Sequence, residues 1–485
     1  MNHSDTSVRR FLCWDESNIA QSENVRLMTH TPTKRNLALV CDDEWEGVHN
    51  GYGSLLRVNG TYRFYYRAMA MRHRMDKTMT PGASVICVAE SNDGITFHKP
   101  ILRRFDYNGT SYNNIVFARP ESIDNFSVFY DENPNCPADE RFKALSDIKR
   151  DGRRLLMYYA SADGYEFREM YPIDVPGTFD SFNVLLWDAS SRLYTLYYRG
   201  FHTKEGEDRL NWPHLDAVND VRDVRRATSA DFRHWTVHGL ISFAEGQADE
   251  SLYTNGILRY YRAPDVFLGF PVRYRERAAE KESFFDMPLG DRHEKVTEVF
   301  GREGTAVTDC LIMTSRDGIV FDRRDEAFLT PGPESQVSWW YGNCYMAYGL
   351  CETPAEEAGA DPEISFYVGE NYRIKNVNFR RYTLRRDGFF SWFAPYRGGE
   401  VLTTPVTVSG DTLSVNFSTS AAGYLSVTLC EPSGEPIPGF EGKRIFGDST
   451  HRVLRFEGDL QSLVGRSVAL RIQMSDAHLY SYCFE

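Results

Sequence analysis

Three carboxylates stand where apolar, strand-like runs begin, at widely spaced points in the chain. Asp180 lies in "GTFDSFNVLLWD", Glu250 opens "ESLYTNGILRYY", and Glu46 lies in "DDEWEGVHNGYGSLL". Two carboxylates that face each other across a pocket can cleave a glycoside, because one protonates the leaving oxygen while the other stays ionised. We therefore predict glycoside hydrolysis if the fold brings these acids together. The alternative for each acid is a strand-end carboxylate bound to backbone N–H groups.

Five further polar or aromatic residues are candidates for binding a substrate. The tripeptide "YYR" occurs twice and ends in Arg67 and in Arg199, and a guanidinium can grip a sugar hydroxyl or hold a carboxylate ionised. The alternative for both arginines is stacking on tyrosines inside the fold. To these two we add Asn114 in "SYNNIVF", Arg273 in "GFPVRY" and Trp339 in "SWWYGN" as predicted substrate-binding residues.

The elements that would position these residues repeat along the chain. A turn of the form "SNDGITF" (91–97) recurs with variations at intervals of 68 to 86 residues, and its aspartates are Asp93, Asp163, Asp231, Asp317 and Asp387. Tyr-rich runs such as "TYRFYYRA" precede the turns and are typical of β-strands. A regular period of several strands predicts a propeller with one blade per period. We expect the turn aspartates to cap backbone N–H groups far from the axis, and not to act as catalysts.

The predicted fold is all-β: a five-bladed β-propeller followed by a β-sandwich. We place an N-terminal strap at 1–45, which could supply a strand that closes the ring. The propeller covers 46–393, and short alternating runs at 394–485 indicate the sandwich. We expect the blades to open near Glu46, at Asn113–Asn114, at Asp180, at Glu250 and near Glu334. Polar residues at the start of each innermost strand would then converge at one end of the axis.

Composition excludes several classes of partner. The net charge of −13 argues against nucleic acid and anionic membranes, and no apolar run is long enough to span a bilayer. The N-terminus lacks the apolar region of a signal peptide, and the nine cysteines contain no CxxC pair. We therefore expect a cytoplasmic protein with free thiols, no metal site and no cofactor, with a structural calcium ion in the channel as the alternative. Homo-oligomerisation stays open.

The blade-three run "FDSFNVLLWDASSRLYTLYYRG" and the later "ESLYTNGILRYYRAPDVFLGF" resemble the five-bladed propeller glycosidases of families 43 and 32. The C-terminal region is similar to the sandwich of family 32 enzymes. This resemblance implies that Asp180 orients the site or tunes a pKa, and that Glu250 is the general acid. In those families a third acid precedes the orienting aspartate by one blade, where this chain has Asn113 and Asn114. Either Glu46 or Asp131 would then supply the third acid, or the mechanism differs from that of those families.

Three functions follow from these patterns. The first is hydrolysis of short oligosaccharides, with furanosides such as fructosyl or arabinosyl glycosides as the expected substrates. The second is a sialidase-like hydrolase, whose arginines would come from Arg67, Arg199, Arg226 and Arg273. The third is a propeller that binds sugar or protein without cleaving it. Acids separated by about 5–10 Å at the channel mouth would favour hydrolysis, whereas acids all paired to Lys or Arg would favour a scaffold.

Overall fold

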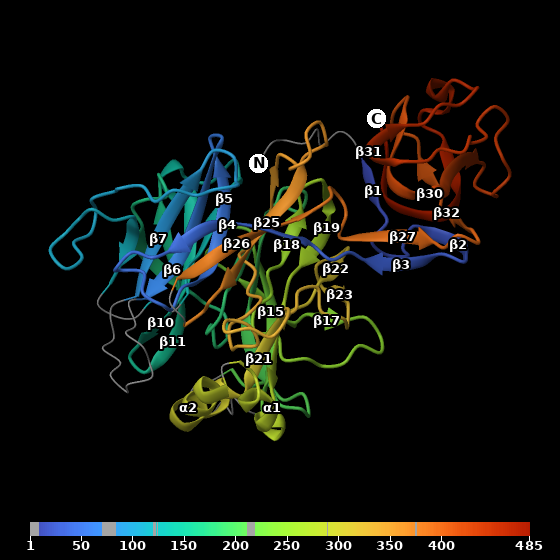
Figure 1. Cartoon of the computed structure of the whole chain (residues 1–485). Helices are drawn as coiled ribbons and strands as arrows, with labels where there is room; N and C mark the ends of the chain where they lie inside the picture. Colours follow the sequence, from blue (N-terminus) through green and yellow to red (C-terminus); the bar gives the residue numbers. More distant parts are fainter. Residues whose placement is uncertain are drawn as a thin grey trace.

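The computed structural model describes residues 9–69, 84–119, 123, 125–210, 219–288, 290–373 and 376–485. Five small sheets stand around one axis as the blades of a propeller, and a larger sheet that contains the C-terminal strands lies beside them (Figure 1). The prediction of an all-β, five-bladed propeller is confirmed. No helix among the described ranges has both the length and the apolar character needed to cross a bilayer.

Each blade is a sheet of at least four strands, whose pairing is antiparallel except for β17 with β23 in blade four. Blade one contains β5 (Gly51–Val58), β6 (Thr61–Met69), β7 (Ser84–Ser91) and β8 (Ile115–Ala118). Blade two contains β9 (Ser127–Tyr130), β10 (Phe142–Arg150), β11 (Arg153–Ser161) and β12 (Arg168–Ile173). Blade three contains β13 (Val184–Asp188), β14 (Leu193–His202), β15 (Val221–Ser229) and β16 (Thr236–Leu240).

The last two blades contain strands from distant parts of the chain. Blade four contains β18 (Leu258–Tyr260), β19 (Ala263–Gly269), β22 (Met313–Ser315), β23 (Val320–Arg323) and the short parallel β17 (Ser242–Phe243). Blade five contains β24 (Cys351–Thr353), β25 (Glu363–Glu370), β26 (Val377–Leu384) and β4 (Thr33–Cys41). Because β4 pairs with β26, an N-terminal strand completes the last blade and closes the ring.

The alternation of side chains along the strands explains why the blades stack. In β6, Phe64 and Tyr66 pack in a cluster with residues of blade five, whereas Tyr65 packs in a cluster with residues of blade two. Side chains of neighbouring residues point to opposite faces of a sheet, so a strand between two blades must be apolar on both faces. The aromatic-rich runs in the sequence are therefore the inter-blade cores.

Hydrogen bonds join the innermost strands of neighbouring blades. Val128 N–H donates to Ser54 Oγ over 3.1 Å, which links blades two and one. Leu55 N–H donates to the Tyr348 carbonyl over 2.8 Å, which links blades one and five. Asn255 Nδ2 donates to the Phe182 carbonyl over 3.3 Å, at the junction of blades four and three.

Blade four carries an insertion that the sequence analysis did not predict. The hairpin of β20 (Val272–Glu276) and β21 (Ala306–Cys310) leads to α1 (Lys281–Phe285) and α2 (Gly290–Phe300), together with 3₁₀ turns at Ala278–Glu280 and Gly301–Gly304. The helices lie at one end of the propeller (Figure 1). This insertion accounts for the long interval between Asp231 and Asp317, because it lies between two strands of the blade.

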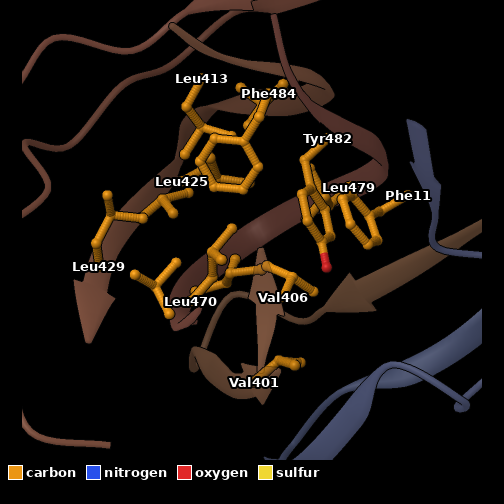
Figure 2. Packing of buried hydrophobic residues seen from close by; sticks show 14 of the residues in the cluster. Phe11, Val401, Val406, Leu413, Leu425, Leu429, Leu470, Leu479, Tyr482 and Phe484 are labelled. Atoms are coloured by element: carbon orange, nitrogen blue, oxygen red, sulfur yellow. The ribbon is translucent and has the colours of Figure 1, made fainter. Parts of the chain in front are cut away.

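The large sheet combines both ends of the chain. It contains β1 (Arg10–Leu12), β2 (Ile19–Glu23), β3 (Arg26–Thr29), β27 (Phe390–Ala394), β28 (Gly399–Thr403), β29 (Val406–Thr407), β30 (Leu413–Cys430), β31 (Asp448–Val453) and β32 (Ser467–Phe484). Figure 2 shows its core, in which the ring of Phe11 stacks on Tyr482 at 4.8 Å between ring centroids. The N-terminal segment thus contributes strands to both parts of the molecule. The β-sandwich and the domain boundaries at 45 and 393 stay predictions.

One expectation about the blades was wrong. The run "SYNNIVF" was expected to open blade two, but Ile115–Ala118 is the outermost strand β8 of blade one, paired with β7. Blade two opens instead at β9, after Asn125. The difference arises because β8 has the same apolar composition as an innermost strand, while only its pairing partner determines its place in the blade.

Candidate functional site

A pocket lies where the innermost strands of four blades begin. It is lined from blade one by Asn50–Gly53 at the start of β5, from blade three by Phe182, from blade four by Tyr253 and Thr254, and from blade five by Tyr345–Tyr348. Arg67, at the end of β6, and Tyr372, just after β25, add side chains from the second strand of their blades. The convergence expected at one end of the axis therefore occurs, although with other residue types than those predicted.

Aromatic rings form the walls of the pocket. The rings of Tyr52 and Phe182 stack with 5.9 Å between centroids and 6° between planes. On the other side, the hydroxyl of Tyr341 donates to that of Tyr253 over 2.9 Å. Such walls offer flat apolar faces with polar tips, which suits a ligand that is itself amphipathic.

The two predicted "YYR" arginines both end near this pocket. Arg67 lines it, and its guanidinium lies 4.9 Å from the ring centroid of Tyr52. Arg199 lies one layer behind, where it donates to the Tyr253 carbonyl and lies 4.8 Å from the Tyr253 ring. A further buried arginine, Arg222, contacts the ring of Tyr274 at 4.2 Å. Burial lowers the pKa of Arg222, and the positive charge of Arg199 lowers it further.

Asp180 is the most exposed of the three predicted acids. It precedes β13, and its side chain is 35% exposed. Arg154 Nη2 lies 3.7 Å from Asp180 Oδ2 and also bonds to Asp147. Burial raises the pKa of Tyr253, a residue that lines the pocket, and the charge of Asp180 raises it further.

Glu250 is not among the described residues that line the pocket. The segment that follows it pairs with β20, since Tyr253 N–H donates to the Val272 carbonyl and Leu252 is bridged to Arg273. Tyr253 and Thr254 line the pocket, whereas the carboxylate of Glu250 lies beside arginines of β20. Its Oε1 accepts a bond of 2.6 Å from Arg275 Nη2, while its buried Oε2 has no hydrogen-bond partner among the described residues.

Glu46 is fully buried within blade one. Its Oε2 accepts bonds from Lys99 Nζ over 2.7 Å and from the Asp43 N–H over 2.9 Å, and its Oε1 accepts one from Tyr66. Burial raises the pKa of Glu46, while Lys99 acts to lower it. Oxygens of Asp42, Asp43 and Glu46 lie within 4.8 Å of one another, but Lys99 Nζ contacts all three. An ammonium group therefore occupies the place that a cation would take.

Among the described residues that line the pocket, none is one of the three predicted acids, and each of these acids has a basic partner within 4 Å. The alternative third acid, Asp131, is buried at the far end of β9, where Tyr194 donates to it over 2.7 Å. Their roles stay predictions.

The other predicted binding residues lie outside the pocket lining. Asn114 donates to Tyr66 and to the Val88 carbonyl within blade one. Arg273 is bound by both oxygens of Asp309, at 3.0 and 2.6 Å. Trp339 donates to the Gly332 carbonyl over 2.8 Å. Their contacts are those of residues that hold loops and blades in place.

Asparagines, and not acids, stand at the openings of the innermost strands. Asn183 Nδ2 donates to the carbonyls of Phe179 and Ser181, and its Oδ1 accepts from Arg199 N–H. Asn255 and Asn343 bind backbone groups in a similar way. An amide can donate and accept at once, so it satisfies both kinds of buried backbone group. A sequence signal for these pocket residues was available: an Asn close to a Tyr recurs in "HNGYG", "YTNG" and "YGNCY".

No protein-family model and no curated protein matches the sequence. Among solved structures, one titled "Glycoside hydrolase" is 11% identical with a TM-score of 0.45, and covers 73% of this chain and 92% of its own. A thermostable family-43 glycoside hydrolase is 11% identical with a TM-score of 0.42, over 76% of this chain and 96% of its own. A β-1,2-mannobiose phosphorylase from Listeria innocua is also 11% identical, with a TM-score of 0.41, over 74% of this chain and 96% of its own.

Proposed function

We propose that this protein cleaves glycosidic bonds in short saccharides that bind in the axial pocket. The observation that carries the proposal is the pocket itself, whose aromatic walls adjoin the buried Arg67 and several phenol hydroxyls. Sugars have apolar ring faces and a rim of hydroxyls, so they match a site of this composition. Furanosides remain the substrates that we would try first.

Among the predicted acids, we retain Asp180 as the carboxylate that acts at the pocket. It is partly exposed, and its charge is felt by Tyr253. For Glu46 and Glu250, the ion pairs with Lys99 and Arg275 support a structural role. We also propose a reducing, cytoplasmic location, in keeping with nine free and buried cysteines.

A second candidate function is saccharide binding without cleavage. It is favoured by one observation: each of the three predicted acids lies within 4 Å of a Lys or Arg nitrogen, as a carboxylate in a structural ion pair does. A binding protein would keep the aromatic pocket and would not need two carboxylates in different protonation states.

A substrate panel separates these functions. The purified protein would be incubated with aryl furanosides, pyranosides and sialosides and with short oligosaccharides, each with and without inorganic phosphate, and the product anomers would be followed by NMR. We expect free sugar to form without phosphate, and Asp180→Asn to slow this by roughly 10²-fold or more. Product only with phosphate would indicate phosphorolysis. Binding by calorimetry with no product in either condition would favour the second candidate.

A further inference from the structure

Tyr372 and His49 form a polar pair in the pocket that the predicted acids do not explain. Tyr372 follows the end of β25, and its ring lines the pocket and is partly exposed. Its hydroxyl is hydrogen-bonded to Nε2 of the buried His49, and the two rings meet at 4.7 Å and 69°. This hydrogen bond joins blade five to the entry of blade one beside the cavity, and next to it Arg373 N–H donates to the Val48 carbonyl over 2.7 Å.

The position of Tyr372 is set by neighbours from three other segments. Gly342, at φ +95°, lies against the tyrosine ring, and a Cβ at this position would overlap it. The guanidinium of Arg373 lies 5.1 Å from the same ring and pairs with Glu303 of the blade-four insertion. Arg292 of α2 donates to the Arg373 carbonyl over 2.6 Å. A side chain held from several directions is suited to present one atom at a defined place.

The pocket needs a proton donor from outside the predicted set. Among the described residues that line it, Glu370 is the one acid, and its carboxylate is bound by Lys34 at 2.7 Å and Arg380 at 2.9 Å. Those partners belong to β4 and β26, so this carboxylate is engaged by the neighbouring strands of blade five. The phenol of Tyr372 is a titratable group that both lines the pocket and contacts a second titratable side chain.

We infer that Tyr372 is the proton donor to the leaving oxygen, and that His49 is the positioning residue that holds the phenol oxygen. This inference rests on the proposed function. In the step, the glycosidic C–O bond breaks as the leaving oxygen takes the Tyr372 proton, and a water oxygen bonds to the anomeric carbon and releases its surplus proton to solvent. Nε2–H of His49 donates to the phenolate oxygen, which then recovers a proton from solvent. The products are two alcohols, with no net change in the protein.

The roles of Tyr372 and His49 are tested by comparing the cleavage rates of substrates whose leaving groups differ in acidity. Tyr372→Phe keeps the ring that packs on Gly342 and removes only the hydroxyl. We expect it to slow cleavage of an oligosaccharide by roughly 10²–10⁴-fold, but to slow an aryl glycoside with an acidic phenol by less than about 10-fold, because that group needs little protonation. His49→Leu should follow the same pattern, and His49→Gln, which retains an N–H donor, should recover part of the rate.

The matched control is Tyr480→Phe. Tyr480 stacks on His478 in the large sheet, outside the propeller, and its hydroxyl lies 3.1 Å from Ser418 Oγ. This variant loses a phenol hydroxyl beside a histidine as well, and it should cleave both substrates at the wild-type rate. Equal slowing of both substrates in Tyr372→Phe, or no slowing of either, would overturn the inference while leaving the proposed function intact.

A second readout needs no turnover. In protein with ¹³C-labelled tyrosine rings, the Tyr372 signal is identified by its loss in Tyr372→Phe. It should shift in His49→Leu and move back towards its wild-type position in His49→Gln, and an unchanged signal would refute the pairing. If the wild type cleaves no member of the panel, the proposed function fails first, and the catalytic role of Tyr372 fails with it.

Discussion

The five repeated aspartate turns share a sequence pattern, but the fifth turn has different surroundings from the first four. In the first four, the turn follows the third strand of a blade and leads towards its fourth, so the aspartate lies at the outer side of the sheet. These turns are in the places that the sequence predicted. The fifth turn also follows the third strand of its blade, β26, but its aspartate is completely buried.

The first four aspartates cap their own turns, and Asp163 also lies 3.3 Å from Arg104 Nη2. Asp163 is typical: its Oδ1 accepts bonds from Tyr165 N–H at 2.8 Å, Glu166 N–H at 3.0 Å and Ser161 Oγ at 3.0 Å. Asp93, Asp231 and Asp317 make the corresponding bonds two and three residues ahead. Backbone donors and serine hydroxyls lower the pKa of Asp163 against the effect of its partial burial.

Asp387 instead joins distant segments. Its Oδ1 accepts bonds from Tyr260 Oη at 2.7 Å and Arg262 Nε at 2.8 Å in blade four. Its Oδ2 accepts one of 2.7 Å from Ser481 Oγ on β32 and lies 3.6 Å from Arg10 on β1. Burial acts to raise the pKa of Asp387, but Arg262 and Arg10 outweigh it and lower that pKa.

The difference comes from the closure of the ring. In blade five the fourth strand is β4, so the chain after Asp387 is free to leave the blade and enter the large sheet as β27. The fifth turn therefore lies at the junction of the two parts of the molecule. The comparison teaches that a local pattern determines the shape of a turn, while its chain neighbours determine what the carboxylate binds.

Among the changes that test this comparison, removal of the Asp387 carboxylate should lower the stability of the protein most. We expect Asp387→Ala to lower the free energy of unfolding by about 3–5 kcal/mol, because it removes the nearest carboxylate from the largely buried guanidinium of Arg262. Urea unfolding followed by tryptophan fluorescence would measure it. A loss no larger than that of Asp317→Ala would mean that Asp387 is another simple turn residue.

The second largest effect should be the change with pH in the contribution of Asp387 to the free energy of unfolding. Because its pKa in the folded state lies below the unfolded value near 3.9, its stabilising effect is present above about pH 4 and is lost as the pH falls through the folded value. Each unit of difference corresponds to about 1.4 kcal/mol. The stability gap between wild type and Asp387→Asn, measured by urea unfolding from pH 7 to pH 3, should therefore narrow on acidification. A constant gap would contradict the lowered pKa.

Substitutions in the first four aspartate turns should have the smallest effect on the free energy of unfolding. Asp317→Ala removes acceptors for the N–H groups of Ile319 and Val320, which solvent can partly replace, so we expect a loss of about 1 kcal/mol. The same urea titration applies, with Asp317→Asn as the control that keeps one acceptor oxygen. A loss above about 3 kcal/mol would show that the outer turns also connect distant segments.

The repeat was readable from the sequence because it depends on contacts a few residues apart. The Ser-x-Asp-Gly turns, the aromatic strands and the number of blades all follow from local patterns that recur along the chain. The helical insertion was missed because α1 and α2 are short. Of the residues that the sequence predicted for the site, Arg67 lines the pocket, and Arg199 donates a hydrogen bond to the carbonyl of Tyr253, which lines it.

The sequence by itself determined the all-β class, the five blades and the capping of four turns. Only the tertiary structure decided that Tyr253 and Thr254, and not Glu250, line the pocket, because a local pattern does not show how this segment lies beside β20. The sequence predicted that the N-terminal strap could close the ring, and the structure decided that β4 does so beside β26, which leaves Asp387 buried against Arg262 and β32. The strands β4 and β26 lie more than three hundred residues apart in the chain, and a local pattern carries no record of which distant strand will pair beside it.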